Sequence, residues 1–245
     1  MIIKNKFWFF SILVTFLFGQ FVSAQTNFNK FDEKGNKHGL WKGLYNDSKR
    51  LKYEGNFEHG VEVGLFTFYD NVEEKRVIAT RDFNINDHSA YTIFYDQNKH
   101  IVSEGKVVNK LFEGPWKYYH HASKILMTLE NYKSGKLDGL KSVYYRDGSI
   151  AEETNYKNNS KEGFYKKYSE AGVVLEATIY KNGLFNGPTT YTDPQGNMVS
   201  KGVYTNGKKT GIWEFFANGK KISQDNFDKP RKKFKKRTSI PQNPY

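Results

Sequence analysis

The chain contains no cysteine among its 245 residues, which excludes disulfide bonds, thiol catalysis and thiolate metal sites together. Beyond residue 24, no window of 11 residues sustains the 3.6-residue period of an amphipathic helix, so helices are not expected. About 200 residues of regular sheet bury enough surface to be stable without disulfide bonds. The composition therefore permits an oxidising compartment without requiring one.

A long apolar run occurs at the N-terminus. Lys4 and Lys6 precede the run from 7 to 18, and Val22 and Ala24 stand at the −3 and −1 positions of a signal-peptidase site. Residues 1–24 are therefore predicted to be a secretory signal peptide, with the mature protein exported to the periplasm or secreted. The alternative is an uncleaved inner-membrane anchor, but about 12 to 16 apolar-leaning residues fall short of the roughly 20 that span a bilayer.

A small residue returns every 24 or 25 residues along most of the remaining chain. Seven of these residues are glycines, and one serine stands where the missing glycine is expected: Gly39, Gly64, Ser89, Gly114, Gly139, Gly163, Gly187 and Gly211. A fixed period of this length indicates an array of stacked units. Such arrays typically bind partners along a surface.

Other positions align with the small residue. Two residues after it stand Trp41, Phe66, Tyr91, Trp116, Lys141, Tyr165, Thr189 and Trp213. Five residues after it stand Leu44, Tyr69, Phe94, Tyr119, Tyr144, Tyr168, Thr192 and Phe216. Seven residues before it stand Phe57, Val107, Tyr132, Tyr156, Tyr180 and Tyr204. Each unit reads small–apolar–aromatic–x–x–aromatic, a polar turn, and a second run with its own aromatic.

The runs and turns predict β-hairpins. Runs of about six or seven residues rich in Tyr, Phe, Val and Thr favour strands. Between them lie pairs such as Asp147-Gly148, Gln195-Gly196 and Asn206-Gly207, which suit tight turns. The predicted fold is all-β, an open antiparallel meander of eight hairpins over residues 25–227. Its sixteen strands would form a twisted ribbon about 75 Å long. The repeat glycine is expected to let a neighbouring ring lie flat over the backbone.

The best-formed units resemble the MORN repeat in its bacterial variant, with the pattern Y-x-N-G-K-x-x-G-x-W. The residues that carry the resemblance run from Tyr132 to Leu140 and from Tyr204 to Trp213. It covers about residues 31–227 and is weakest around Ser89 and around Thr189 and Thr192. The resemblance implies the same hairpin ribbon. Bacterial proteins of this family are often labelled antitoxin components, a label that transfers no catalytic residue.

The aromatic positions are interpreted first as the core, because a single-layer sheet has few other residues to bury. A binding face is the alternative, since tyrosine and tryptophan combine stacking area with a polar tip. For that case the candidates are the aromatics of well-formed units: Trp116, Tyr119, Trp213 and Phe216.

Positive charge is concentrated at the C-terminus. Residues 228–245 contribute +6 and the first 24 residues +2, which leaves +4 of the chain's +12 for the repeats. The basic residues of this tail are Lys229, Arg231, Lys232, Lys233, Lys235, Lys236 and Arg237. Its three prolines disfavour regular structure, so a disordered tail is predicted. It is either simply solvated or a contact for an anionic membrane, an envelope polymer or an acidic protein. Export argues against nucleic acid as the partner.

Catalytic patterns are missing from the sequence. The histidines have no metal-ligand spacing: His38, His59, His88, His100, His120 and His121. Adjacent acids such as Glu152 and Glu153 should face opposite sides of a strand, which prevents them from acting as an acid–base couple. No nucleophile elbow or phosphate-binding loop occurs. The expectation is a protein without enzymatic activity, metal or cofactor.

The sequence therefore predicts an exported binding or scaffolding element of a bacterial cell envelope, whose partner is a protein or an envelope polymer. The alternative from another class is an antitoxin or immunity role, in which the ribbon neutralises a toxic partner protein.

Overall fold

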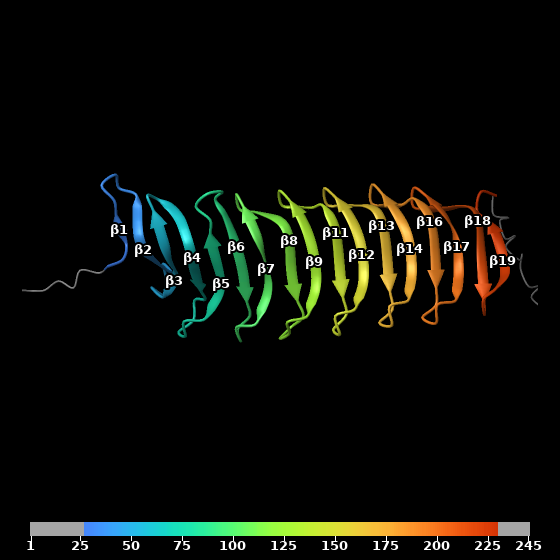
Figure 1. Cartoon of the computed structure of the whole chain (residues 1–245), viewed down its shortest axis with the longest axis horizontal. Coiled ribbons are helices and arrows are strands. Elements are labelled where there is room, and N and C mark those ends of the chain that lie inside the picture. Colours follow the sequence, from blue (N-terminus) through green and yellow to red (C-terminus); the bar gives the residue numbers. More distant parts are fainter. Residues whose placement is uncertain (1–26, 230–245) are drawn as a thin grey trace, which may run out of the picture.

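A computed structural model describes residues 27–229, which form one open β-sheet without a helix (Figure 1). The strands are β1 (Lys30–Phe31), β2 (Lys37–Leu44), β3 (Leu51–Glu58), β4 (Val61–Tyr69), β5 (Val77–Phe83), β6 (Ser89–Tyr95), β7 (Ile101–Val108), β8 (Leu111–Tyr119), β9 (Leu126–Lys133), β10 (Lys136–Leu137), β11 (Gly139–Tyr144), β12 (Ile150–Lys157), β13 (Ser160–Tyr168), β14 (Val174–Lys181), β15 (Leu184–Phe185), β16 (Gly187–Thr192), β17 (Met198–Thr205), β18 (Lys208–Ala217) and β19 (Lys220–Asn226). The predicted signal peptide and the tail from residue 230 onward lie outside the described residues.

Neighbouring strands in the chain pair with each other in antiparallel fashion, so the sheet is a meander and the predicted fold is confirmed. Figure 1 shows the strands lying across the long axis of a ribbon, with turns along both long sides. All sixteen predicted strand positions occur. The count reaches 19 because β1 is an additional short strand and two predicted strands are each interrupted, at Asp138 and at Asn186.

Two faces of the sheet differ in chemistry. Successive side chains of a strand point to opposite faces, so Trp116 and its neighbour Lys117 lie on different sides. We call the side to which Phe66, Trp116 and Trp213 point the tryptophan face. The opposite side, which carries Glu54, Glu104 and Glu153, is the glutamate face. The three rings of the tryptophan face are 1%, 1% and 0% exposed and form the core of the ribbon.

The repeat glycines do not serve the predicted purpose. A Cβ on Gly64 would meet nothing within 4 Å, so no ring lies over this residue. Its φ of 63° lies in the left-handed region that favours glycine. It falls where the pairing of β3 with β4 shifts register, between Glu54 and Asn56. The repeat glycine therefore permits a β-bulge that increases twist, and the prediction that a ring covers it is wrong.

A second set of glycines lies beneath the rings. Gly55, Gly105 and Gly202 each stand nine residues before a repeat glycine. A Cβ on any of them would overlap the ring of Phe66, Trp116 or Trp213, respectively. These positions are glycine because a ring lies against the backbone there. The close contact of a ring with a glycine backbone, which was expected at the repeat glycines, therefore occurs at Gly55, Gly105 and Gly202 instead.

The third unit has a different register. Ser89 replaces the repeat glycine, and β5 pairs with β6 without any register shift. The residues that follow therefore lie one position out of phase with the other units. Thr92, not Tyr91, points to the tryptophan face and is 0% exposed, whereas Tyr91 is 43% exposed on the glutamate face. A one-residue shift exchanges the faces of a strand, which accounts for the difference.

The hairpin turns are of two kinds. At Asn182–Gly183, Asn206–Gly207 and Asn218–Gly219 both residues have positive φ, as a two-residue type I′ turn requires. At the turns containing Gly148, Gly172 and Gly196, positive φ occurs at the glycine. There the glycine N–H donates to the residue three before it, as from Gly148 to the Tyr145 carbonyl at 3.0 Å.

Candidate functional site

The four aromatic candidates from the sequence do not form one surface. Trp116 and Trp213 are buried on the tryptophan face, with their indole N–H groups donating to backbone carbonyls of Lys106 and Val203 at 2.9 and 3.1 Å. Tyr119 and Phe216 lie three residues further along the same strands and therefore point to the glutamate face. Trp116 and Tyr119 thus share strand β8, and Trp213 and Phe216 share strand β18. In each strand the two side chains lie on opposite faces of the sheet.

A row of tyrosine–glutamate pairs runs along the centre of the glutamate face. The Tyr119 hydroxyl donates to Glu104 and the Tyr168 hydroxyl donates to Glu153, both at 2.6 Å. Burial and the hydrogen bond to Glu153 raise the pKa of Tyr168 to about 12. Burial opposes ionisation of Glu104, but hydrogen bonds from Tyr119 and a lysine outweigh it and lower the pKa of Glu104. These groups satisfy one another, so they stabilise the face.

An exposed apolar row lies beside the tyrosines on the same face. It consists of the residue that follows the repeat glycine in each unit, with Tyr91 in the shifted third unit: Leu40, Leu65, Tyr91, Pro115, Leu140, Phe164, Pro188 and Ile212. We call these eight residues the apolar stripe. Leu40 is 37% exposed and Leu65 58%, both prolines are exposed, and Leu140 is half-buried. Successive members are two strands apart, a spacing of about 10 Å.

The stripe is widest toward the C-terminal end. Phe164 of β13 lies opposite Ile179 of β14, and Pro188 of β16 lies opposite Val203 of β17. Earlier stripe residues instead lie opposite polar residues, as Leu40 does opposite Asn56 and Leu65 opposite Asp82. Ile179 and Val203 are 40% and 44% exposed. Apolar side chains therefore adjoin one another across β13 to β18 on a surface that no other described element covers.

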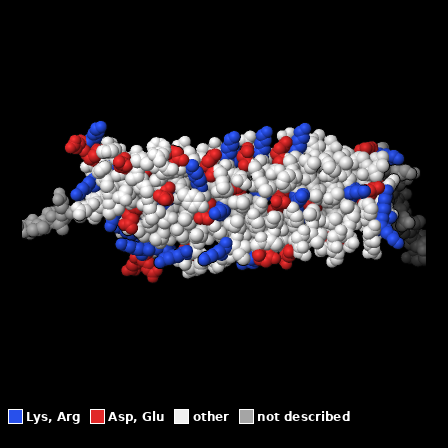
Figure 2. All heavy atoms as spheres, in the orientation of Figure 1, with Lys and Arg blue, Asp and Glu red and all other residues white. Residues whose placement is uncertain are grey.

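Charge does not mark a site on the face of the ribbon seen in Figure 2. Lys and Arg are interspersed with Asp and Glu on the face seen in Figure 2, and neither sign covers a continuous area there. Ion pairs join neighbouring strands, such as Lys141 with Glu130 at 2.7 Å and Lys201 with Glu214 at 3.0 Å. This distribution matches the near-balanced charge of the repeats.

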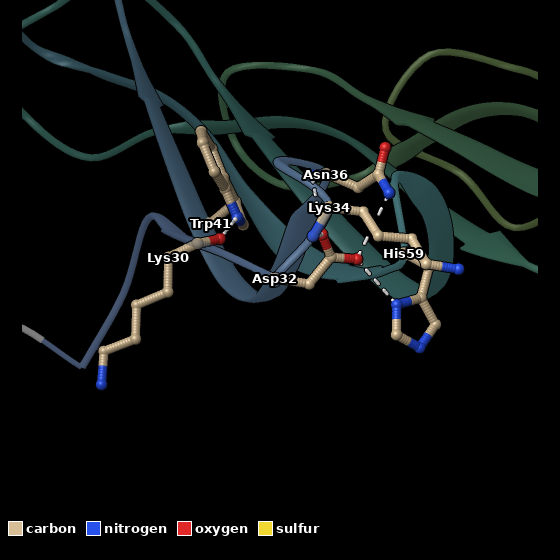
Figure 3. A network of polar contacts seen from close by, with 6 residues as sticks. All are labelled: Lys30, Asp32, Lys34, Asn36, Trp41 and His59. Atoms are coloured by element: carbon tan, nitrogen blue, oxygen red, sulfur yellow. Dashed lines mark hydrogen bonds and ion pairs between the residues drawn. The ribbon is translucent and has the colours of Figure 1, made fainter.

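A polar network closes the N-terminal end of the ribbon (Figure 3). Asp32 accepts hydrogen bonds from the backbone N–H groups of Lys34 and Asn36 at 2.9 and 2.8 Å. Its other oxygen lies 2.8 Å from Nδ1 of His59, and this contact with His59 is the main cause that lowers the pKa of Asp32 to about 2. The Trp41 indole donates to the Lys30 carbonyl at 3.0 Å. The network joins the β1–β2 loop to the β3–β4 turn and therefore has a structural role.

The carboxylates and histidines do not converge. Glu152 accepts from Tyr165 at 3.3 Å on the tryptophan face, while Glu153 accepts from Tyr168 on the glutamate face. The predicted separation of this pair is thus confirmed. Among residues 27–229, no group of three or more His, Asp and Glu residues is arranged to hold a metal ion. The same residues include no helix with the length and hydropathy of a membrane span.

Of the basic residues predicted to contact an anionic surface, Lys229 is described and is exposed at the C-terminal end of the ribbon. The others lie outside the described residues: Arg231, Lys232, Lys233, Lys235, Lys236 and Arg237.

The fold and surface define a single-layer hairpin-repeat protein with one apolar-striped face. No protein-family model matches the chain, and no curated protein sequence matches it.

The apolar stripe is the feature that sequence reasoning did not select. Seven of its eight residues occupy the apolar position of the repeat, directly before the aromatic one, whereas Tyr91 was aligned with the aromatic position itself. Adjacent strand residues point to opposite faces, so burial of the aromatic position leaves the apolar position exposed. The stripe can be identified from the sequence because an apolar residue directly precedes the buried aromatic position in unit after unit.

Proposed function

We propose that the protein is an exported, MORN-like repeat protein that acts as a non-enzymatic binding or scaffolding element at the bacterial cell envelope. The observation that carries this proposal is the apolar stripe, which runs along one face through every unit. Contiguous exposed apolar patches mark interaction sites on soluble proteins. Glu104 and Glu153 on that face already accept hydrogen bonds from tyrosines, and Glu104 also pairs with Lys117, which favours an apolar protein partner over a charged polymer.

The energetics favour a partner that extends along several hairpins. Complete burial of a large apolar side chain contributes about 1.5–3 kcal/mol, so burying one that is already half-buried contributes about 1 kcal/mol. Association costs at least about 4 kcal/mol of translational and rotational freedom. Burial of two or three stripe residues therefore does not offset the cost of association, whereas burial of most of the stripe does. An elongated ribbon with one contact in each unit meets this requirement.

Acidic substitutions in the stripe test the proposal. In the double variant Phe164→Glu and Ile212→Glu, we expect association with envelope proteins, measured by native size separation of cell extracts, to fall at least tenfold. The far-UV spectrum should stay unchanged because both side chains are exposed. The matched control is Lys167→Glu, which adds an acid to the same strand as Phe164 but on the tryptophan face. Unchanged association of the double variant would contradict the proposal. If the partner is a toxic protein whose effect co-expression relieves, the antitoxin role applies.

We also propose that the basic tail adds contact with anionic envelope material. Each Lys or Arg near an anionic membrane contributes about 1 kcal/mol at low salt. Deletion of residues 228–245 should therefore reduce binding to vesicles containing phosphatidylglycerol by at least tenfold and remove its salt dependence. The unfolding transition of the ribbon should remain. Equal salt-sensitive binding by the truncated protein would refute the role of the tail.

A further inference from the structure

A cavity of about 470 Å³ opens on the tryptophan face over β5, β6 and β7. Its apolar walls include the rings of Phe83, Phe94 and Phe112. Two basic side chains, Arg81 and Lys110, line it together with His88. The cavity lies on the face opposite the apolar stripe, so it is independent of the surface proposed above.

The cavity exists because two rings of the repeat pattern are missing side by side. In the second unit, rings alternate in edge-to-face contacts, from Phe57 to Phe66 at 5.3 Å and from Phe66 to Phe83 at 5.1 Å. The next two positions in this zigzag hold Thr92 and Val107 instead of rings. Thr92 results from the register shift of the third unit. Val107 stands seven residues before its repeat glycine, where most other units carry Phe57 or a tyrosine, and it lines the cavity.

Arg81 lies in this cavity without a carboxylate partner. Its guanidinium lies 5.4 Å from the centre of the Phe68 ring, a cation–π contact, and it is half-buried. No ion pair joins Arg81 to an acid among residues 27–229. Glu62 is the acidic residue of the lining and is exposed, while Lys110 is also exposed. The lining therefore carries a net positive charge, and a half-buried arginine surrounded by rings is a suitable site for an anion.

Thr92 lies beside the cavity, although it is not one of the lining residues. Thr92 is 0% exposed and its hydroxyl has no hydrogen-bond partner in the described part of the chain. It lies between Ala90 and Phe94 on the same face of β6, and both of these residues line the cavity. Because the side chain of Thr92 is fully covered, its hydroxyl does not reach the cavity, and Thr92 contributes to the site only by leaving out a ring.

We propose that this cavity binds a small anion built on a flat apolar ring, such as an aryl carboxylate. The volume lies within the range of ligand pockets. The ring of the ligand takes the place of the two missing aromatic side chains and stacks among Phe83, Phe94 and Phe112. The carboxylate accepts a bidentate pair of hydrogen bonds from Arg81. Glu62 at the rim disfavours ligands with several negative charges.

Titration of the full chain with 2-naphthoate, followed by calorimetry, tests the proposal. We expect binding at one site, with the neutral isostere 2-naphthamide binding at least about tenfold more weakly because it loses the charge-assisted contact. Arg81→Gln should weaken 2-naphthoate binding by a similar factor. Arg146→Gln, which removes an exposed turn arginine far along the chain, should leave it unchanged. Equal affinity for acid and amide, or no effect of Arg81→Gln, would overturn the proposal.

A second variant separates the cavity from the charge. Val107→Tyr places at this position the residue that most other units carry, so it should fill the cavity and preserve or raise the unfolding midpoint. Binding of 2-naphthoate should then be lost although Arg81 is retained. Undiminished binding by this folded variant would show that the ligand does not occupy the cavity.

Discussion

Glycine serves two different purposes within one hairpin of this protein. Gly64 adopts a left-handed conformation in open space, whereas Gly55 lies directly under the ring of Phe66. At Gly64 a side chain is disfavoured by backbone geometry, and at Gly55 it is disfavoured by overlap with a core ring. The two positions should therefore respond differently to the same substitutions.

Paired substitutions in the β3–β4 hairpin test this distinction. Gly55→Ala should destabilise the protein by about 3 kcal/mol, because Phe66 must leave its packed position. Gly64→Ala should cost about 1–2 kcal/mol, the typical cost of left-handed backbone. Asparagine tolerates that conformation, so Gly64→Asn should recover part of the loss while Gly55→Asn should not. Urea unfolding measures all four variants, and identical responses at both positions would contradict the assignment.

The sequence located the repeat glycines but assigned to them the role that Gly55, Gly105 and Gly202 have in the structure. The period of 24 or 25 residues is visible in the chain, whereas the sign of φ at each glycine is not. The clue to the second role was a correlation. Where Gly55, Gly105 and Gly202 occur, Phe or Trp stands eleven residues later. In other units, the two positions eleven residues apart hold other side chains that contact each other, such as Glu130 with Lys141 or Thr178 with Thr189.

The hairpins use two turn types, which differ in their demands on sequence. Asn206 has a φ of 49° and precedes Gly207 in a type I′ turn. Gln195 precedes Gly196 at the other long side of the ribbon, where positive φ is confined to the glycine. The identity of the residue before glycine therefore matters at the first turn and much less at the second.

Alanine substitutions at these two positions test the turn assignment. Asn206→Ala should lower the free energy of unfolding by about 1–2 kcal/mol, because alanine resists left-handed backbone. Gln195→Ala, an exposed change without that requirement, should stay within about 0.5 kcal/mol of the wild type. Thermal or urea unfolding provides the comparison. Equal effects of the two substitutions would indicate that both turns share one geometry.

Hairpins were the elements best predicted from sequence, because turn residues and strand composition agree within each unit. The third unit was the exception. Ser89 preserves the spacing of the repeat, so Tyr91 and Phe94 were aligned with the aromatic positions of other units. Without the glycine there is no bulge, and Thr92 and Tyr95 take those places instead. Spacing alone does not reveal whether a bulge forms, and the shift of one residue decides which side chain is buried.

At the scale of the whole molecule, a single-layer ribbon must divide its apolar residues between two faces. The tryptophan face buries the largest rings, those of Phe66, Trp116 and Trp213, and the glutamate face carries the tyrosine row with the exposed apolar stripe beside it. The sequence predicted the ribbon and assigned its aromatic positions first to the core, where Trp116 and Trp213 lie, with a binding face as the alternative. Burial depends on packing between the rings of neighbouring strands, which the pattern within one strand does not contain.

Site-specific photocrosslinking in living cells tests the central claim, that the glutamate face binds a partner through its apolar stripe. A benzophenone amino acid replaces either Phe164, a stripe residue, or Lys167, an exposed residue of the same strand that points to the tryptophan face. The account predicts one discrete protein adduct from position 164 and from a second stripe position, Leu65, with none from position 167. Adducts from position 167 alone, or the same adducts from both faces, would contradict it.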